Sequence, residues 1–338
     1  MLISTPVVQC MTYTLCAIPM KENDSSHRSF LTSVSRFGAA SIKAGSGTAR
    51  ARQSVRVPWS SGLEAPRNKA PARAADCHHH IYDSRFPVDP MAKLRPDNAT
   101  VADYRLLEER LGIMRHVVVQ PSTYGSDNRC LLDALQQFGR AATRGIAVVD
   151  TEVSNTALRE MRAAGVCGIR FNLSQAGATT LDMVEPLAKR IAALGWHVQV
   201  NAPAEQILAG MAIWNRLPVP VVFDHLAHVP TTEEPVFRAV GHLLQSGKCW
   251  VKLSGAYMDT KVGAPTYSDR AAVARAYIKE APERLVWGTD WPHPTASDKP
   301  DDALLFDLLA QWSGSEAVRT RILVQNPALL YGFGIAGN

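Results

Sequence analysis

Short β-branched runs alternate with longer helical stretches from about residue 75 to the end of the 338-residue chain. Stretches between the runs have helical spacing, for example VADYRLLEERLG after Thr100, which is a suitable N-cap. Eight runs are candidate strands: 75–82, 115–122, 144–150, 167–172, 197–202, 220–225, 249–255 and 284–290. Eight βα units in about 260 residues predict an α/β protein of the (β/α)₈ (TIM) barrel type. A doubly wound open sheet is the competing fold, but no G-x-G-x-x-G follows the first strand. The last helical stretch, EAVRTRILVQNPALLYGF, is expected to close the barrel or to pack across its base.

The net charge of +5 comes from the N-terminal part of the chain. Residues 1–75 hold 10 Lys and Arg against 3 Asp and Glu, whereas the other residues hold 26 against 28. The barrel region therefore lacks the basic surface of a nucleic-acid-binding protein. No stretch reaches the roughly 18 apolar residues of a membrane-spanning helix. We expect neither a nucleic-acid partner nor a membrane span, and the oligomeric state stays open.

Residues 1–74 lack strong periodicity and are rich in Ser, Ala, Arg, Gly and Pro, which predicts a disordered extension before a barrel domain at 75–338. A targeting role is the alternative. His27-Arg28-Ser29-Phe30-Leu31 resembles a twin-arginine export signal that has lost one arginine, although Arg36 and Lys43 interrupt its apolar part. The stretch 25–56 instead resembles an organellar transit peptide.

The cysteines indicate a reducing compartment. None of the six is spaced as C-x-x-C, and several lie in apolar, strand-like runs. They are Cys10, Cys16, Cys77, Cys130, Cys167 and Cys249. We therefore expect free buried thiols and a cytoplasmic protein, with export as the alternative.

Ionisable residues collect at the ends of predicted strands one, six and eight, where active sites form in barrels of this type. These residues are His78, His79 and His80, then Asp224 and His225, then Asp290. Strand alternation places His78 and His80 on one face and His79 on the other, and it places Cys77 behind the barrel. Two histidines at i and i+2 can converge on one metal ion or one carbonyl oxygen.

Three motifs carry a family resemblance: Asp76-Cys-His-His-His80, Phe223-Asp-His225 and Val286-Trp-Gly-Thr-Asp-Trp-Pro-His293. Together they resemble the amidohydrolase superfamily over roughly residues 75–335. More narrowly they are similar to its amidohydrolase-related subgroup, which contains 2-pyrone-4,6-dicarboxylate lactonase, sulfomuconolactonase and galactarolactone isomerase. The resemblance implies that His78, His80, His225 and Asp290 are catalytic.

Departures from the superfamily pattern concern the metal. Two-metal members carry a bridging Lys or Glu on strand four and a metal-binding His on strand five. Here strand four ends in Arg170-Phe171-Asn172 and strand five ends in Asn201, while His197 sits at the opposite end of that strand. The resemblance therefore implies either no metal or one divalent ion, Zn or Mn, on His78, His80 and Asp290.

Candidate substrate-binding residues follow several strands. Arg170 is the best carboxylate clamp, because a guanidinium pairs bidentately with a carboxylate. Tyr257 and Met258 stand where relatives that bind a dicarboxylate supply an arginine, which suggests a substrate with less negative charge. The remaining candidates are Ser122, Tyr124 and Asn128 after strand two, His228 after strand six and His293 after strand eight.

Hydrolysis of a small lactone, such as a pyrone- or muconolactone-type compound, is the leading function. Asp290 is expected to take a proton from water while the histidines or a metal stabilise the oxyanion. The alternatives in the same superfamily are a metal-dependent nonoxidative decarboxylase of an aromatic or muconate-type acid and a lactone isomerase. A catalytically inactive barrel that binds a ligand is the alternative from another class.

Overall fold

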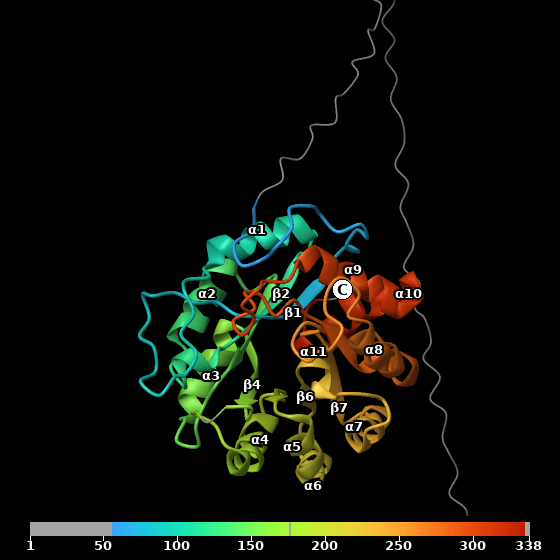
Figure 1. The fold of residues 1–338 in the computed structure, drawn as a ribbon. Helices are drawn as coiled ribbons and strands as arrows, with labels where there is room; N and C mark the ends of the chain where they lie inside the picture. The colour runs from blue at the N-terminus through green and yellow to red at the C-terminus, as the bar shows by residue number, and fades with distance from the viewer. Residues whose placement is uncertain (1–55, 176, 335–338) are drawn as a thin grey trace, which may run out of the picture. The chain divides into compact units, whose positions relative to one another are not determined.

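The fold is a barrel of eight parallel strands in the order β1 to β8, seen in a computed structural model that describes residues 56–175 and 177–334. Every strand pairs with its neighbour in the sequence, and helices lie around the outside (Figure 1). All eight predicted strands are present. They are Ala75–His79, Arg115–Val119, Thr143–Ala147, Val166–Asn172, His197–Asn201, Val221–Phe223, Cys249–Leu253 and Leu285–Trp287.

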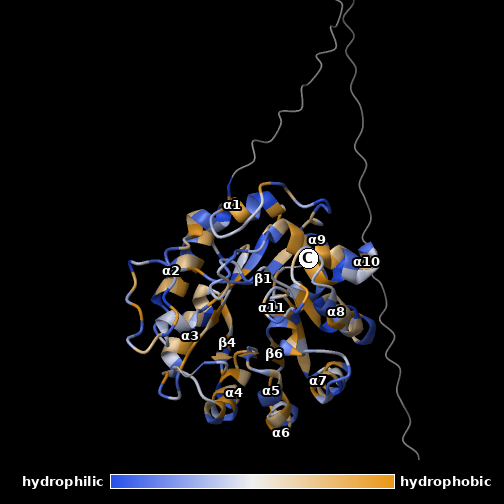
Figure 2. Cartoon of the chain, viewed as in Figure 1, coloured by the Kyte–Doolittle hydropathy of each residue, from blue (hydrophilic) through white to orange (hydrophobic). Residues whose placement is uncertain are grey.

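Eleven helices lie within the described residues, and they carry both hydrophobic and hydrophilic residues (Figure 2). Thr100 caps α1 through a capping box, as the sequence predicts, and Gly112 ends it in the left-handed conformation. The helices α1 to α11 are Val101–Leu111, Arg129–Phe138, Asn155–Ala164, Val184–Ala192, Ala204–Ala209, Met211–Arg216, Pro235–Gln245, Ser268–Glu280, Asp302–Ser313, Glu316–Thr320 and Asn326–Tyr331.

The C-terminal segment packs across the base of the barrel, as predicted. Tyr331 and Phe333 join an apolar cluster with inward-facing strand residues such as Val117 and Val222. Cys77 belongs to the same cluster, so its predicted place behind the barrel is wrong. The strand register shifts between Asp76 and His79, and this irregularity breaks the simple alternation on which that prediction depended.

A seam joins the first and last strands. The Asp290 N–H donates to the His78 carbonyl and the His80 N–H donates to the Trp291 carbonyl, each over 2.8 Å. Gly288 permits the approach, because a Cβ there would lie 2.7 Å from the His78 backbone nitrogen. The seam therefore places the end of β8 directly against the histidines of β1.

The buried Asp76 carboxylate fastens the seam from the helix side. Its Oδ1 accepts the backbone N–H of His78 and of Thr289, both at 3.0 Å. Its Oδ2 accepts the Thr289 hydroxyl at 2.6 Å and the Tyr104 hydroxyl at 2.9 Å. Burial raises the pKa of Asp76 to about 6, although all four bonds favour the ionised form.

The barrel unit begins earlier than the expected boundary at residue 75. Both oxygens of Asp307 accept backbone N–H groups of the preceding segment, from Arg67 at 2.9 Å and from Asn68 at 2.8 Å. The Trp291 indole donates to the Pro58 carbonyl at 2.8 Å. Residues 56–74 are thus irregular but packed, whereas the targeting interpretations fall largely on residues outside the described part.

Two further expectations concern the cysteines and a membrane span. Cys77, Cys130, Cys167 and Cys249 are all free. None of the helices in residues 56–334 is long and apolar enough to cross a membrane.

The buried His197 generates a prediction about acid stability. Burial, and then the nearby Lys252, lower the pKa of His197 to about 3, whereas an unfolded histidine titrates near about 6.5. The unfolded chain therefore binds the extra proton first, and stability falls as the pH drops below about 6.5.

We expect His197 to contribute a loss of up to about 1.4 kcal/mol per pH unit below that point. His197→Gln should remove this contribution and flatten the pH dependence. Urea unfolding of both proteins at pH 7 and pH 5 measures the difference. Equal pH slopes in the two proteins would contradict the prediction.

Candidate active site

The four histidine and aspartate residues predicted to be catalytic converge at the mouth of the barrel. The Nε2 atoms of the three histidines lie around Asp290 Oδ1, at 3.3 Å for His78, 3.5 Å for His80 and 3.8 Å for His225. All four side chains are buried. His79 points away and stacks on Tyr104 with ring centroids 3.6 Å apart, as the alternation predicts.

Two of these residues, His225 and Asp290, lie in strained backbone. Residues 225–228 are four consecutive non-glycine residues with φ between 50° and 56°, and Asp290 has φ of 65°. Left-handed backbone costs about 1–2 kcal/mol per residue, so it persists where the surrounding contacts determine it. This turn carries His225 toward Asp290 and His228 toward the neighbouring loops.

Hydrogen bonds to the outer ring nitrogens and to Asp290 orient the cluster. His80 Nδ1 donates to the Val119 carbonyl at 2.8 Å, so its Nε2 presents a lone pair to the centre. His225 Nδ1 lies 3.0 Å from the Ser254 hydroxyl. The Tyr257 hydroxyl donates to Asp290 Oδ2 at 2.5 Å, which leaves Oδ1 facing the histidines.

The electrostatics keep Asp290 ionised beside the neutral rings of His78 and His225. Burial by itself would raise the pKa of Asp290, but the surrounding histidines, His225 first, hold it far below its usual range. Burial lowers the pKa of His225 to about 4. Burial and Lys252 lower the pKa of His78 well below its usual value. Asp290 is therefore ionised at neutral pH and can accept a hydrogen bond from water.

A buried polar layer lies beneath the cluster, and the sequence reasoning missed it. Lys252 Nζ donates to Gln199 Oε1 at 2.7 Å and lies 3.1 Å from His78 Nδ1. Asp224 lies 3.4 Å from Lys252 and accepts from Arg170 Nε at 3.3 Å and from Gln199 Nε2 at 3.1 Å. Strand alternation could have found Lys252, because it shares the inner face of β7 with Trp250.

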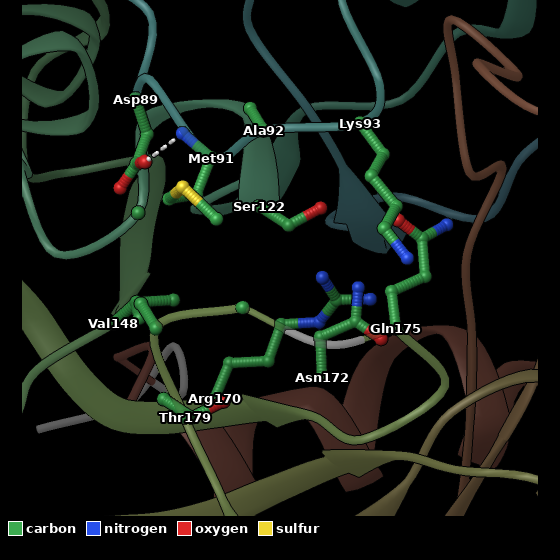
Figure 3. Close-up of a pocket in the computed structure, with 13 residues that line it drawn as sticks. Asp89, Met91, Ala92, Lys93, Ser122, Val148, Arg170, Asn172, Gln175 and Thr179 are labelled. Carbon is green, nitrogen blue, oxygen red and sulfur yellow. Dashed lines mark hydrogen bonds between the residues drawn. The ribbon is translucent and has the colours of Figure 1, made fainter.

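The structure places Arg170 and Ser122 along a cleft over the ends of β2, β3 and β4 (Figure 3). Arg170 uses Nε to bind Asp224, and its guanidinium reaches the cleft beside Asn172. Lys93 and Gln175 line the same cleft. The cleft therefore offers several hydrogen-bond donors, and Asp224 connects its Arg170 to His78 of the histidine cluster.

Other predicted substrate contacts have partners within the protein. The Asn128 amide binds both backbone groups of Val148, at 2.8 and 3.0 Å. The Tyr124 hydroxyl binds both backbone groups of Asp83, at 2.8 and 3.1 Å. These two side chains shape the loop after β2, and the structure does not bring them into the cleft.

The remaining two predicted contacts lie in the loops after β6 and β8. His293 Nε2 lies 3.1 Å from Asp302, and its ring packs edge-on against Tyr257 with centroids 5.1 Å apart. His228 lies 2.8 Å from both Asp259 and Asn201. Each histidine thus braces a neighbour of the site.

The geometry of one side-chain group fits a metal ion. His78 Nε2, His80 Nε2 and Asp290 Oδ1 are separated by 3.3, 3.4 and 3.5 Å. Tetrahedral zinc with bonds of about 2.0–2.1 Å holds its ligands about 3.3–3.4 Å apart. The His80 bond to Val119 is the kind that orients a ligating histidine. This group can therefore hold one divalent ion.

Removing Lys252 should destabilise the fold, because Asp224 would lose a buried counter-charge. We expect Lys252→Met to lower the free energy of unfolding by about 3–5 kcal/mol. Arg216→Met is the matched control: Arg216 pairs with Glu185 at 2.7 Å on the surface, where a pair is worth about 0–1 kcal/mol. Urea denaturation at pH 7 measures both, and similar losses in the two variants would contradict the prediction.

Comparisons with known proteins identify the family of the chain. The amidohydrolase family model matches residues 75–333. The 2-pyrone-4,6-dicarboxylate hydrolase of Comamonas testosteroni is 34% identical over 81% of this chain and 95% of its own length. The D-galactarolactone isomerase of Agrobacterium fabrum is 32% identical over 79% of this chain and 94% of its own.

A crystal structure from Acinetobacter baumannii has a TM-score of 0.69 and 28% identity, covering 77% of this chain and 100% of that one. It is described as a probable 2-pyrone-4,6-dicarboxylic acid hydrolase with citric acid bound. The fold, the motifs and these similarities agree: the chain belongs to the amidohydrolase family.

Proposed function

We propose that this protein is a lactonase that opens a small cyclic ester bearing a carboxylate. The observation that carries the proposal is the convergence of three histidine Nε2 atoms on Asp290 Oδ1, with Asp224 linking His78 of this cluster to Arg170 in the cleft. Two relatives named for lactone chemistry, the hydrolase and the isomerase, support it. The citric acid in the Acinetobacter structure supports a carboxylate as the recognised group.

In the proposed reaction, Asp290 Oδ1 takes a proton from water and the hydroxide attacks the lactone carbonyl. The ring C–O bond then breaks, and the leaving oxygen takes the proton back from Asp290. His80 presents a bare Nε2, so it accepts a hydrogen bond from the same water. Lys252 can only donate, so its contact with His78 Nδ1 places the ring proton on Nε2. His78 then donates to the oxyanion, and His225 can join it when Ser254 donates to its Nδ1.

A divalent ion on His78, His80 and Asp290 would polarise the carbonyl and lower the pKa of a bound water. His78 would then donate its Nδ1 proton to Asp224 Oδ1, which lies at 3.2 Å, and leave Nε2 free to ligate. The His78 tautomer thus distinguishes the two forms: contact with Lys252 favours the metal-free form, and contact with Asp224 favours the metal-bound one.

Lactone isomerisation is the second candidate, favoured by the similarity to D-galactarolactone isomerase. Product analysis separates the two reactions, because hydrolysis releases one acid group per turnover and isomerisation releases none. The candidate substrate carries fewer negative charges than a pyrone dicarboxylate, because Tyr257 and Met258 follow β7 where relatives that bind a dicarboxylate supply an arginine.

Asp290→Asn should remove nearly all turnover of a lactone panel. The two side chains are nearly equal in size, and loss of general-base action typically costs about 10²–10⁴-fold. Acid release measures the activity, and circular dichroism checks the fold. Asp269→Asn on α8 is a control at a partly exposed surface carboxylate and should keep full activity. Turnover that survives in Asp290→Asn would exclude this base.

Elemental analysis should find at most one divalent ion per chain. Arg170 and Asn201 stand where a second ion would need ligands, and the positive charges of Arg170 and Lys252 disfavour another cation nearby. His80→Ala should lower any zinc or manganese content, because it removes one of the three ligands. Two tightly bound ions per chain, or unchanged metal content in the variant, would contradict this assignment.

A further inference from the structure

We infer that a hydrogen-bonded chain from Asp259 through His228 and Asn201 turns the amide nitrogen of Asn172 toward the cleft, where it binds the substrate carboxylate with Arg170. His228 is then a positioning residue for specificity. The inference rests on the proposed function, because it names the substrate group that the cleft beside the histidine cluster recognises.

The contacts of the chain run across the ends of four neighbouring strands, β4 to β7. His228 Nδ1 lies 2.8 Å from Asp259 Oδ2, and His228 Nε2 lies 2.8 Å from Asn201 Oδ1. Asn201 Nδ2 donates to Asn172 Oδ1 at 3.1 Å. The four residues therefore connect the loop after β7 with the ends of β5 and β4.

The hydrogen bonds of the chain all run in one direction, because the Asp259 carboxylate at its start can only accept a hydrogen bond. The Asp259 carboxylate accepts a hydrogen bond from His228 Nδ1, and that bond helps to lower the pKa of Asp259 against the effect of burial. Asn201 Oδ1 faces His228 Nε2 and accepts from it. Asn201 then donates to the Asn172 oxygen, and the Asn172 nitrogen is left for the cleft.

The Asn172 side-chain nitrogen would act in the cleft. Asn172 lines it together with Arg170 and Ser122, and Figure 3 shows the Asn172 amide beside the Arg170 guanidinium. An amide N–H₂ next to a guanidinium suits a carboxylate, which accepts from both. A neutral carboxamide would bring donors of its own and would match this surface poorly.

The strained turn at residues 225–228 supports a role beyond placing His225. All four residues are left-handed, and the turn ends with the His228 ring between Asn201 and Asp259. Strain of this kind persists where the surrounding structure fixes it, and it clusters at functional sites. The turn thus delivers one histidine to the reacting centre and a second to the specificity chain.

Binding of isophthalate and isophthalamide by calorimetry tests the inference with two planar compounds that hold no lactone. The wild-type protein should bind isophthalate more tightly than isophthalamide. His228→Gln and Asn172→Ala should each weaken isophthalate binding about tenfold, the loss of one charge-assisted hydrogen bond. The double variant should be no weaker than Asn172→Ala, because His228 acts through Asn172. The exposed His242→Gln is the control and should bind normally.

Kinetics with a lactone of the panel that the wild-type protein turns over give a second measurement. A positioning role predicts a raised KM with kcat nearly unchanged in His228→Gln. If that variant fails to fold, Asn201→Leu, which has a similar volume and breaks two bonds of the chain, takes its place with the same expectation. Additive losses in the double variant, tighter binding of the diamide, or a lower kcat at constant KM would overturn the inference.

The two proposals fail in different ways. Tight isophthalate binding without turnover of any lactone would refute the proposed function and leave the carboxylate subsite in place. Lactone turnover without preference for isophthalate over isophthalamide would refute the hydrogen-bonded chain and leave the lactonase in place.

Discussion

The Asp76 carboxylate at the seam between β1 and β8 is the contact on which the site most depends. It accepts hydrogen bonds from the backbone of both strands, and it lies one position from the register shift that brings His78 inward. Asp290 reaches the β1 histidines only because the seam is closed beside them. The first and last βα units of the chain therefore share one reacting centre.

Charge balance explains how so many ionisable groups stay buried together. Asp224 faces two cations, Arg170 and Lys252, while Asp290 faces the histidines, and all of these side chains are almost fully buried. Each unpaired buried charge would cost several kcal/mol, so the layer is stable only as a set. The neutral His78 lies between the two carboxylates and can change its hydrogen-bond partner without changing the total charge.

The barrel, its eight strands and the convergence of the four main residues follow from patterns visible in the sequence, because strand ends meet at one mouth. Cys77 was misplaced, since a local register shift cannot be read from alternation. Asn128 and Tyr124 find backbone partners that only the tertiary structure brings near. Lys252 was overlooked because a lone lysine in an apolar strand has no local partner.

The packed segment at residues 56–74 reaches the same seam from outside. Trp291, which follows Asp290, hydrogen-bonds the Pro58 carbonyl, and Val57 is buried. A chain shortened to the first barrel strand would expose this tryptophan and leave the Asp307 carboxylate without its two backbone donors. Proteolytic cleavage within residues 56–74 would therefore reduce catalysis as well as stability, although the cleaved bond belongs to none of the eight βα units.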